Sequence, residues 1–154
     1  MKKYIYLTLT FLTVVLINGC TTYYISTDSL KQQFATIDST KMKEVAVSGP
    51  AMAGAGILYK GYKYKANPIV TIQCTDKNGN PKELINSPSI ETRITYGHKN
   101  KKTIFYFDRI YVDSKYVYGV GSRFIESIRS SIPLDSITKI EIQDGHKKFR
   151  YVNN

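Results

Sequence analysis

The sequence predicts a mainly β, single-domain protein, an antiparallel meander that forms a small barrel or a sandwich, with one short helix near its N-terminus. Short runs of alternating apolar and polar residues follow one another from about residue 43 onward. Asn-Gly and Asp-Gly pairs, which favour tight hairpins, separate some of these runs. With 154 residues, 42% apolar and 22% charged, the chain suits one globular core rather than two cores or a disordered polymer.

The N-terminus has the organisation of a secretory signal. Lys2 and Lys3 precede an apolar stretch over residues 4–17, and Gly19 and Cys20 follow it. The stretch contains three threonines and is shorter than the roughly 20 apolar residues that a membrane-spanning helix needs. We therefore expect residues 1–19 to be a signal peptide that is removed from the mature protein.

The four residues Ile17, Asn18, Gly19 and Cys20 resemble the lipobox of bacterial lipoproteins. This resemblance implies cleavage before Cys20, a lipid on its thiol and acylation of the new amino terminus. Thr21 follows where inner-membrane lipoproteins often carry an acid, so the resemblance favours the outer membrane, on its periplasmic face or at the cell surface. More than one acyl chain gives stable anchoring. The alternative is an ordinary secretory signal that ends near a cysteine.

On this interpretation, residues 20–27 are a lipidated tether and residues 28–154 are the β-rich domain. A short helix is expected from about residue 29 to residue 36, because Leu30, Phe34 and Ile37 fall on one helical face. Ser29 with Gln32 three residues later resembles a capping box. The apolar face of this helix either covers the sheet or binds a partner.

The expected strands lie in segments of alternating or aromatic sequence, and a Gly- and Ala-rich stretch at residues 48–56 interrupts the pattern. These segments are 58–65, 68–74, 89–96, 103–112, 116–120, the second half of 132–143, and 147–152. Turns are expected at Asn78–Gly79 and at residues 97–102, and a hairpin at Asp144–Gly145. Pro133 is expected to open a single helical turn before the penultimate strand, a feature that is similar to SH3-like barrels.

Few residues are suited to catalysis, and we expect no enzyme activity, metal or cofactor. His98 and His146 lie in lysine-rich turns, and Cys74 alternates with Ile72 as a buried thiol would. Asp108 is the exception, because it lies in the middle of an aromatic strand. An inward carboxylate needs a partner, so we expect Tyr106 or a cross-strand Arg or Lys beside it. The alternative is an envelope hydrolase that uses Asp108 as its acid.

The segment from Tyr59 to Lys65 is the best candidate binding surface. Alternation along a strand places Tyr62 and Tyr64 on one face and Lys63 and Lys65 on the other, a combination suited to sugars or anionic polymers. The alternatives are an edge strand that its lysines protect, or an edge that pairs with another protein. The candidate ligand-binding residues are Tyr59, Tyr62, Lys63, Tyr64 and Lys65.

A second basic surface is expected at one end of the meander, where an up-and-down topology would bring two basic loops together. It would bind an anionic envelope component or an envelope protein, unless its charge serves solubility alone. The candidate residues are Lys99, Lys101, Lys102, Arg123 and Arg129. The formal charge of +10 would also suit nucleic acid, but an exported protein does not meet it.

Taken together, these features predict a membrane-anchored envelope lipoprotein that acts as a non-catalytic binding or structural module. It resembles small β-rich envelope lipoproteins of Gram-negative bacteria. Its expected partners are the membrane, through the lipid anchor, and an anionic component or protein of the envelope.

Overall fold

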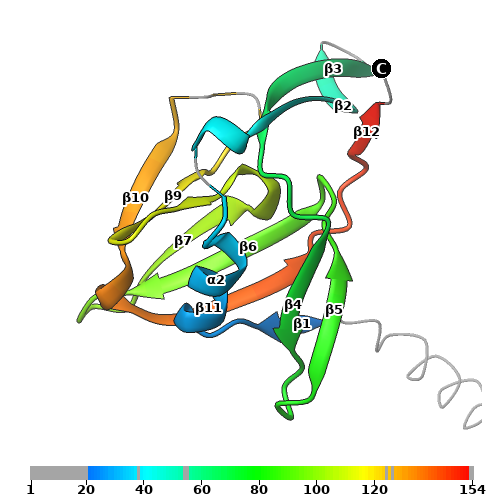
Figure 1. The fold of residues 1–154 in the computed structure, drawn as a ribbon. Helices are drawn as coiled ribbons and strands as arrows, with labels where there is room; N and C mark the ends of the chain where they lie inside the picture. The colour runs from blue at the N-terminus through cyan, green and yellow to red at the C-terminus, as the bar shows by residue number, and fades with distance from the viewer. Residues whose placement is uncertain (1–20, 38, 54–55, 124, 126, 153–154) are drawn as a thin grey trace, which may run out of the picture.

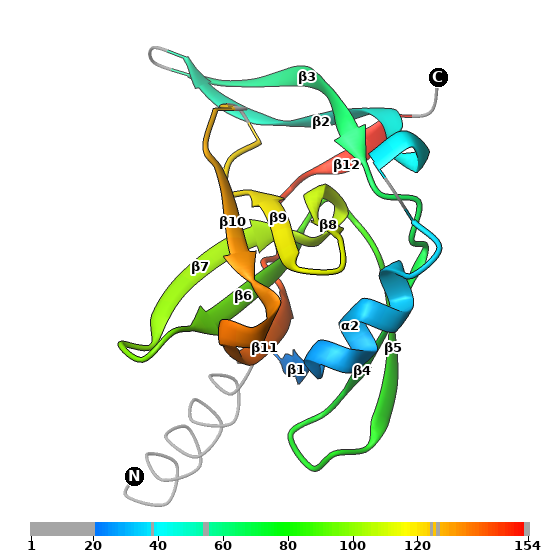
Figure 2. The same cartoon turned by 60° about the vertical axis from the view of Figure 1, so that its left-hand side comes forward.

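The computed structural model describes residues 21–37, 39–53, 56–123, 125 and 127–152, and for residues 39, 50–53 and 56–60 it describes the backbone alone. The predicted signal peptide and Cys20 lie outside the described residues. Within these described residues the fold is mainly β, as predicted, with three antiparallel sheets and one α-helix. The sheets do not close into a barrel, and the small sheet of β2, β3 and β12 lies at the top of the molecule (Figures 1 and 2).

The largest sheet has six strands in the order β5-β4-β1-β11-β6-β7. Its strands are β1 (Thr22–Tyr24), β4 (Thr71–Thr75), β5 (Pro81–Ile85), β6 (Ile90–Tyr96), β7 (Lys101–Tyr106) and β11 (Ile137–Asp144). The predicted simple meander is wrong for this sheet, because β1 and β11 are inserted between two hairpins. The residues expected in a tether instead include β1, where Tyr23 pairs with Ile142.

The other two sheets have three strands each, in the orders β10-β9-β8 and β12-β2-β3. Their strands are β8 (Tyr111–Val112), β9 (Tyr116–Val120), β10 (Arg129–Pro133), β2 (Lys43–Ala53), β3 (Gly56–Ala66) and β12 (Arg150–Val152). The hairpin predicted at Asp144–Gly145 is wrong, since β12 pairs with β2, with Tyr151 opposite Val47. Residues 48–53 of the Gly- and Ala-rich stretch continue β2 and do not interrupt it.

The helix α2 (Thr27–Phe34) begins two residues earlier than predicted. Its N-cap is Ser26, whose hydroxyl accepts a hydrogen bond from the Ser29 backbone N–H at 3.1 Å. The predicted capping box at Ser29 is therefore wrong. The predicted apolar face is confirmed, because Leu30 and Phe34 are buried in the core. No helix in the described part of the chain is both long and apolar enough to cross a membrane.

Two hydrophobic clusters stabilise the described structure. The main one packs α2 against the six-stranded sheet and the sheet of β8–β10, and Ile72, Ile94 and Ile142 are fully buried in it. As predicted, Cys74 is buried beside Ile72. The small cluster consists of Val47, Tyr64 and Ala66, with Val45 and Phe149 packed against it.

The aromatic run at residues 103–112 is not one strand. β7 ends at Tyr106, the short 3-10 turn η2 (Phe107–Arg109) follows, and the chain continues as β8. Every residue of 105–110 is buried, because this segment passes through the interior between two sheets. Further 3-10 turns are η1 (Ser39–Lys41) and η3 (Leu134–Ser136), and η3 is the single turn predicted after Pro133.

Candidate functional site

An open cleft of about 790 Å³ lies between β3 and the sheet of β8–β10. We call it the basic cleft, because four basic side chains and one acidic side chain line it. The charged residues are Lys63, Lys65, Arg109, Arg129 and Glu44. The remaining lining residues are Met42, Tyr64, Tyr111, Tyr118, Gly119, Val120, Ser130 and Ser131.

The β3 wall of the basic cleft follows the alternation predicted from the sequence. Lys63 and Lys65 are exposed, whereas Tyr64 is 4% exposed and belongs to the small hydrophobic cluster. Glu44 lies opposite Lys65 in the β2–β3 register and its carboxylate is 3.9 Å from the Lys63 ammonium. Tyr62 is half-buried, and the side chain of Tyr59 lies outside the described residues. The predicted surface thus forms one wall of the cleft through Lys63, Tyr64 and Lys65.

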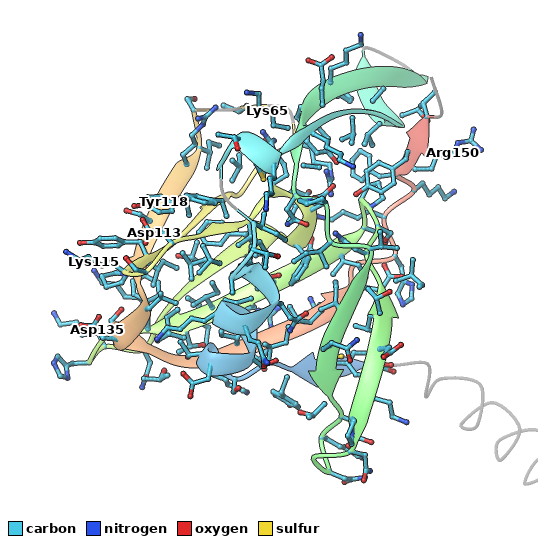
Figure 3. All side chains as sticks on the ribbon, viewed as in Figure 1. Lys65, Asp113, Lys115, Tyr118, Asp135 and Arg150 are labelled. Atoms are coloured by element: carbon cyan, nitrogen blue, oxygen red, sulfur yellow. The ribbon has the colours of Figure 1, made fainter. Side chains whose placement is uncertain are left out.

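Tyrosines from β8 and β9 form the opposite wall. The rings of Tyr111 and Tyr118 stack with centroids 5.4 Å apart and planes inclined by 22°. The Tyr118 hydroxyl donates a hydrogen bond to the Asp113 carboxylate at 3.0 Å, and Figure 3 shows the two residues side by side. Asp113 also accepts backbone N–H bonds from Lys115 and Tyr116, and these hold the pKa of its carboxyl below the usual value. The Tyr118 ring is therefore held in a fixed position.

Arg109 enters the basic cleft from the turn η2 and is 5% exposed. Its guanidinium lies 4.7 Å from the centroid of the Tyr64 ring, and its Nη1 donates to the Ser122 carbonyl at 2.6 Å. A cation over an aromatic face is attracted by the ring quadrupole. The preceding residue of the same turn, Asp108, has its side chain buried in the interior. The turn η2 therefore connects the cleft to the buried groups beneath it.

Beneath the cleft lies a buried ion pair. The Arg123 Nη2 is 3.1 Å from Asp108 Oδ1, and both side chains are fully inaccessible to solvent. Arg123 also donates to the Pro88 carbonyl and stacks on Tyr106, with its guanidinium carbon 3.9 Å from the ring centroid. Asp108 is inward, and the partner that an inward carboxylate needs is Arg123, which comes from a loop and not from a facing strand.

Two tyrosines complete the set of groups around Asp108. The hydroxyls of Tyr64 and Tyr151 both donate to Asp108 Oδ2, and Arg123 donates to the Tyr64 hydroxyl oxygen. Burial, followed by the nearby Asp108 charge, raises the pKa of both tyrosines far above the usual value. They remain protonated donors at neutral pH and are unsuited to act as bases.

We call these four residues, Tyr64, Asp108, Arg123 and Tyr151, the buried junction after its ion pair, although Tyr151 is 37% exposed. Asp108 lies in η2, directly after β7 of the six-stranded sheet, and Arg123 lies between β9 and β10. Tyr64 and Tyr151 belong to β3 and β12 of the small sheet. The buried junction therefore links all three sheets, and Tyr64 belongs to both the junction and the wall of the basic cleft.

The second predicted basic surface is wrong in two respects. Arg123 is buried in the junction, so it is no part of an exposed surface. Lys99 is exposed in the turn between β6 and β7, and Lys101 and Lys102 are exposed at the start of β7. This turn lies next to η3, where the Gly97 N–H donates to the Ser136 carbonyl. That turn lies beyond the Pro133 end of β10, whereas Arg129 is at the other end and lines the basic cleft. Because the strand order is not sequential, the β6–β7 turn and Arg129 lie apart.

The remaining candidates for chemistry lie apart from both sites. His98 and His146 are exposed in turns, as predicted, and burial raises the pKa of the Cys74 thiol. In the described ranges, no group of three or more His, Cys, Asp or Glu side chains is arranged to hold a metal ion.

Sequence reasoning named Lys63, Tyr64, Lys65 and Arg129 and missed the other lining residues, among them Arg109, Tyr111 and Tyr118. The alternation of tyrosine and valine in YVYGV does indicate that Tyr116 and Tyr118 share an outer face. Nothing in the sequence places this face opposite β3.

Comparison of the chain with protein-family models, with curated proteins and with solved structures finds no match.

Proposed function

We propose that this protein is a membrane-anchored lipoprotein of the Gram-negative envelope whose β-rich domain binds anionic ligands without catalysis, in the basic cleft. The observation that carries the proposal is the lining of the cleft, with four basic side chains against one acidic side chain around a tyrosine wall. The proposed anchor is the lipid on Cys20, at the lipobox-like sequence that precedes the domain.

The composition of the cleft suits a ligand that carries both negative charge and flat apolar surface. Lysine and arginine attract anionic groups, with a strength that falls as salt rises. Stacked tyrosines offer aromatic faces at little entropic cost, because each side chain has only two rotatable torsions. Ser130 and Ser131 add hydroxyl groups, which can donate hydrogen bonds to an anionic oxygen.

The proposed tether between the lipid on Cys20 and the β-rich domain is short. The strand β1 begins at Thr22, two residues after the proposed lipidated Cys20. A trans peptide chain advances at most about 3.6 Å per residue. The domain would therefore lie against the membrane surface and present its cleft to ligands near that surface.

The anchor is tested by expressing the full chain in a Gram-negative host beside a Cys20→Ser variant. We expect the wild type to begin at Cys20, to carry acyl mass by intact mass spectrometry and to enter the detergent phase. The variant should do none of these. An unmodified wild-type protein in the aqueous phase would contradict the anchor.

The cleft is tested with dextran sulfate, and neutral dextran of the same length is the control ligand. We expect binding that weakens in Lys63→Gln/Lys65→Gln, because one wall of the cleft loses its charge. The matched control is Lys101→Gln/Lys102→Gln, which removes the same charge at a distant turn. Equal weakening in both variants would show that net charge, and not the cleft, binds the anion.

The envelope hydrolase built on Asp108 has little support. Asp108 is fully buried, its carboxylate accepts bonds from Arg123, Tyr64 and Tyr151, and it does not line the cleft. An assembly role through an edge strand has a specific observation in its favour, since β3 is at the edge of its sheet. A similarity to SH3-like barrels remains a prediction supported by the single turn η3 before β11.

A further inference from the structure

We propose that the occupant of the basic cleft is an extended polypeptide segment of alternating acidic and apolar residues, which adds as a strand to the outer edge of β3. The inference rests on the proposed function, because it names the class of anion that the cleft takes. It also states how the ligand is recognised, through backbone hydrogen bonds as well as through charge.

The basic cleft lies beside β3, which is an edge strand of the small sheet. The small sheet has the order β12-β2-β3, so β2 occupies one side of β3 and the other side is the sheet edge. Lys63, Tyr64 and Lys65 are consecutive, and all three line the cleft. Consecutive side chains of a strand point to opposite faces. A cleft that reaches all three therefore includes the outer edge of the strand, and it also reaches Met42 and Glu44 around the start of β2.

The opposite wall has the same character. The strand β10 is also an edge strand, in the order β10-β9-β8, and its consecutive residues Arg129, Ser130 and Ser131 line the cleft. An extended chain in the cleft would thus lie between two strand edges. Edge strands carry rows of backbone N–H and C=O groups that are templates for pairing with another chain.

The two faces of β3 determine the side chains of the incoming strand. Lys63 and Lys65 are exposed on one face, and Tyr64 lies on the other. Directly opposite residues of paired strands contact each other on the same face. Acidic residues are therefore expected beside the lysines and apolar residues beside the tyrosine, with a period of two. The excess of basic over acidic groups in the cleft favours this pattern over a basic or neutral peptide.

Four synthetic peptides of eight residues, of three kinds, test the proposal against the full chain. The first alternates Glu and Val, and the second has the same composition in the order Glu-Glu-Val-Val. The third kind is the alternating peptide with N-methyl groups on either its odd or its even residues, which removes the N–H groups of one edge. Affinity is measured by fluorescence anisotropy, with dextran sulfate measured in parallel.

We expect the alternating peptide to bind about tenfold or more tightly than the block peptide, because two or more cross-strand contacts are lost in the latter. One N-methylated form should lose affinity to a similar degree, about tenfold for two hydrogen bonds, while the other form retains it. Lys63→Gln/Lys65→Gln should weaken the alternating peptide, and Lys101→Gln/Lys102→Gln should not.

Equal binding of the alternating and block peptides, or of both N-methylated forms, would overturn the proposal. Binding of dextran sulfate without any peptide would overturn it as well, but would leave the anion-binding function in place. If neither bound, the proposed function would fail together with the inference.

Discussion

The two hydrophobic clusters of this protein differ in size and in how they attach to their surroundings. The main cluster contains sixteen buried residues, drawn from α2 and from two of the sheets. The cluster beneath the small sheet contains three, Val47, Tyr64 and Ala66. Three residues bury too little apolar surface to orient a sheet of two eleven-residue strands and β12.

The difference shows what the buried junction contributes. The small sheet gains its fixed position from Tyr64 and Tyr151, which donate to Asp108 beneath it. One wall of the basic cleft belongs to this sheet and the other to β8–β10. The shape of the cleft therefore depends on a polar contact, whereas the six-stranded sheet depends on apolar packing.

The largest expected effect is at the ion pair. Asp108→Asn should lower the free energy of unfolding by about 3–5 kcal/mol, because Arg123 would be left as an uncompensated buried charge. Urea denaturation followed by circular dichroism measures this. Asp135→Asn, at an exposed aspartate in η3, is the control and should change stability by less than about 0.5 kcal/mol. Equal effects of the two substitutions would contradict the role of the junction.

Glycine substitutions sharpen the contrast between the two clusters. A Cβ at Gly119 would lie 2.3 Å from the ring of Phe105, which is 1% exposed and has no room to move. Gly119→Ala should therefore cost about 1–3 kcal/mol. A Cβ at Gly49 would lie 2.0 Å from Phe149, but this ring is half-buried and can turn outward, so Gly49→Ala should cost less.

Gly61→Ala is the matched control for both glycine variants, because a Cβ at Gly61 meets nothing within 4 Å. The melting temperatures of the three variants, measured by thermal unfolding, give the order of their losses of stability directly. A larger loss in Gly49→Ala than in Gly119→Ala would mean that the small cluster is as rigid as the main one.

Alkaline pH should weaken the junction selectively. Burial, followed by the Asp108 charge, raises the pKa of Tyr64 above its unfolded value of 10.0. Above that pH the folded chain holds the Tyr64 proton that the unfolded chain releases, so stability falls as pH rises. This contribution is fully present below pH 10.0. The fall between pH 9 and pH 11, measured by urea titration, should be shallower in Tyr64→Phe; an identical slope would contradict this assignment.

The smallest expected effect is at the cleft itself. Lys63 and Lys65 are exposed, so Lys63→Gln/Lys65→Gln should change the free energy of unfolding by no more than about 0.5 kcal/mol while it weakens anion binding. Stability and dextran sulfate affinity are measured on the same preparation. A large loss of stability would mean that these lysines belong to the structure and not to a binding surface.

The local features of the fold were predictable because they depend on neighbouring residues. The faces of β6 and β11, the apolar face of α2 and the turn at Gly79, where φ is +84°, all follow from the order of apolar and turn residues. The pairing of β1 with β11 and of β12 with β2 was not predictable, since these contacts join segments that are distant in the sequence. No local pattern in Thr22–Tyr24 distinguishes a central strand from a polar tether.

Part of the candidate site was also predictable, because it depends on residues that are neighbours in the sequence. Alternation placed Lys63 and Tyr64 on opposite faces, and the position of Asp108 among aromatic residues indicated a buried pair. The identity of its partner did not follow, because Arg123 lies in a loop whose sequence is typical of an exposed one. The opposite wall of the cleft is set by the packing of separate sheets, which one sequence does not reveal.

The most direct test of the role of the buried junction is native-state hydrogen exchange of the wild type and of Tyr151→Phe, which removes one donor to Asp108. In the wild type, amides of β2 and β3 should open at a lower free energy than those of β6 and β11. In Tyr151→Phe the opening free energy of β2 and β3 should fall by about 1 kcal/mol, with β6 and β11 unchanged. Equal protection of all four strands, or an equal fall in all of them, would contradict the account.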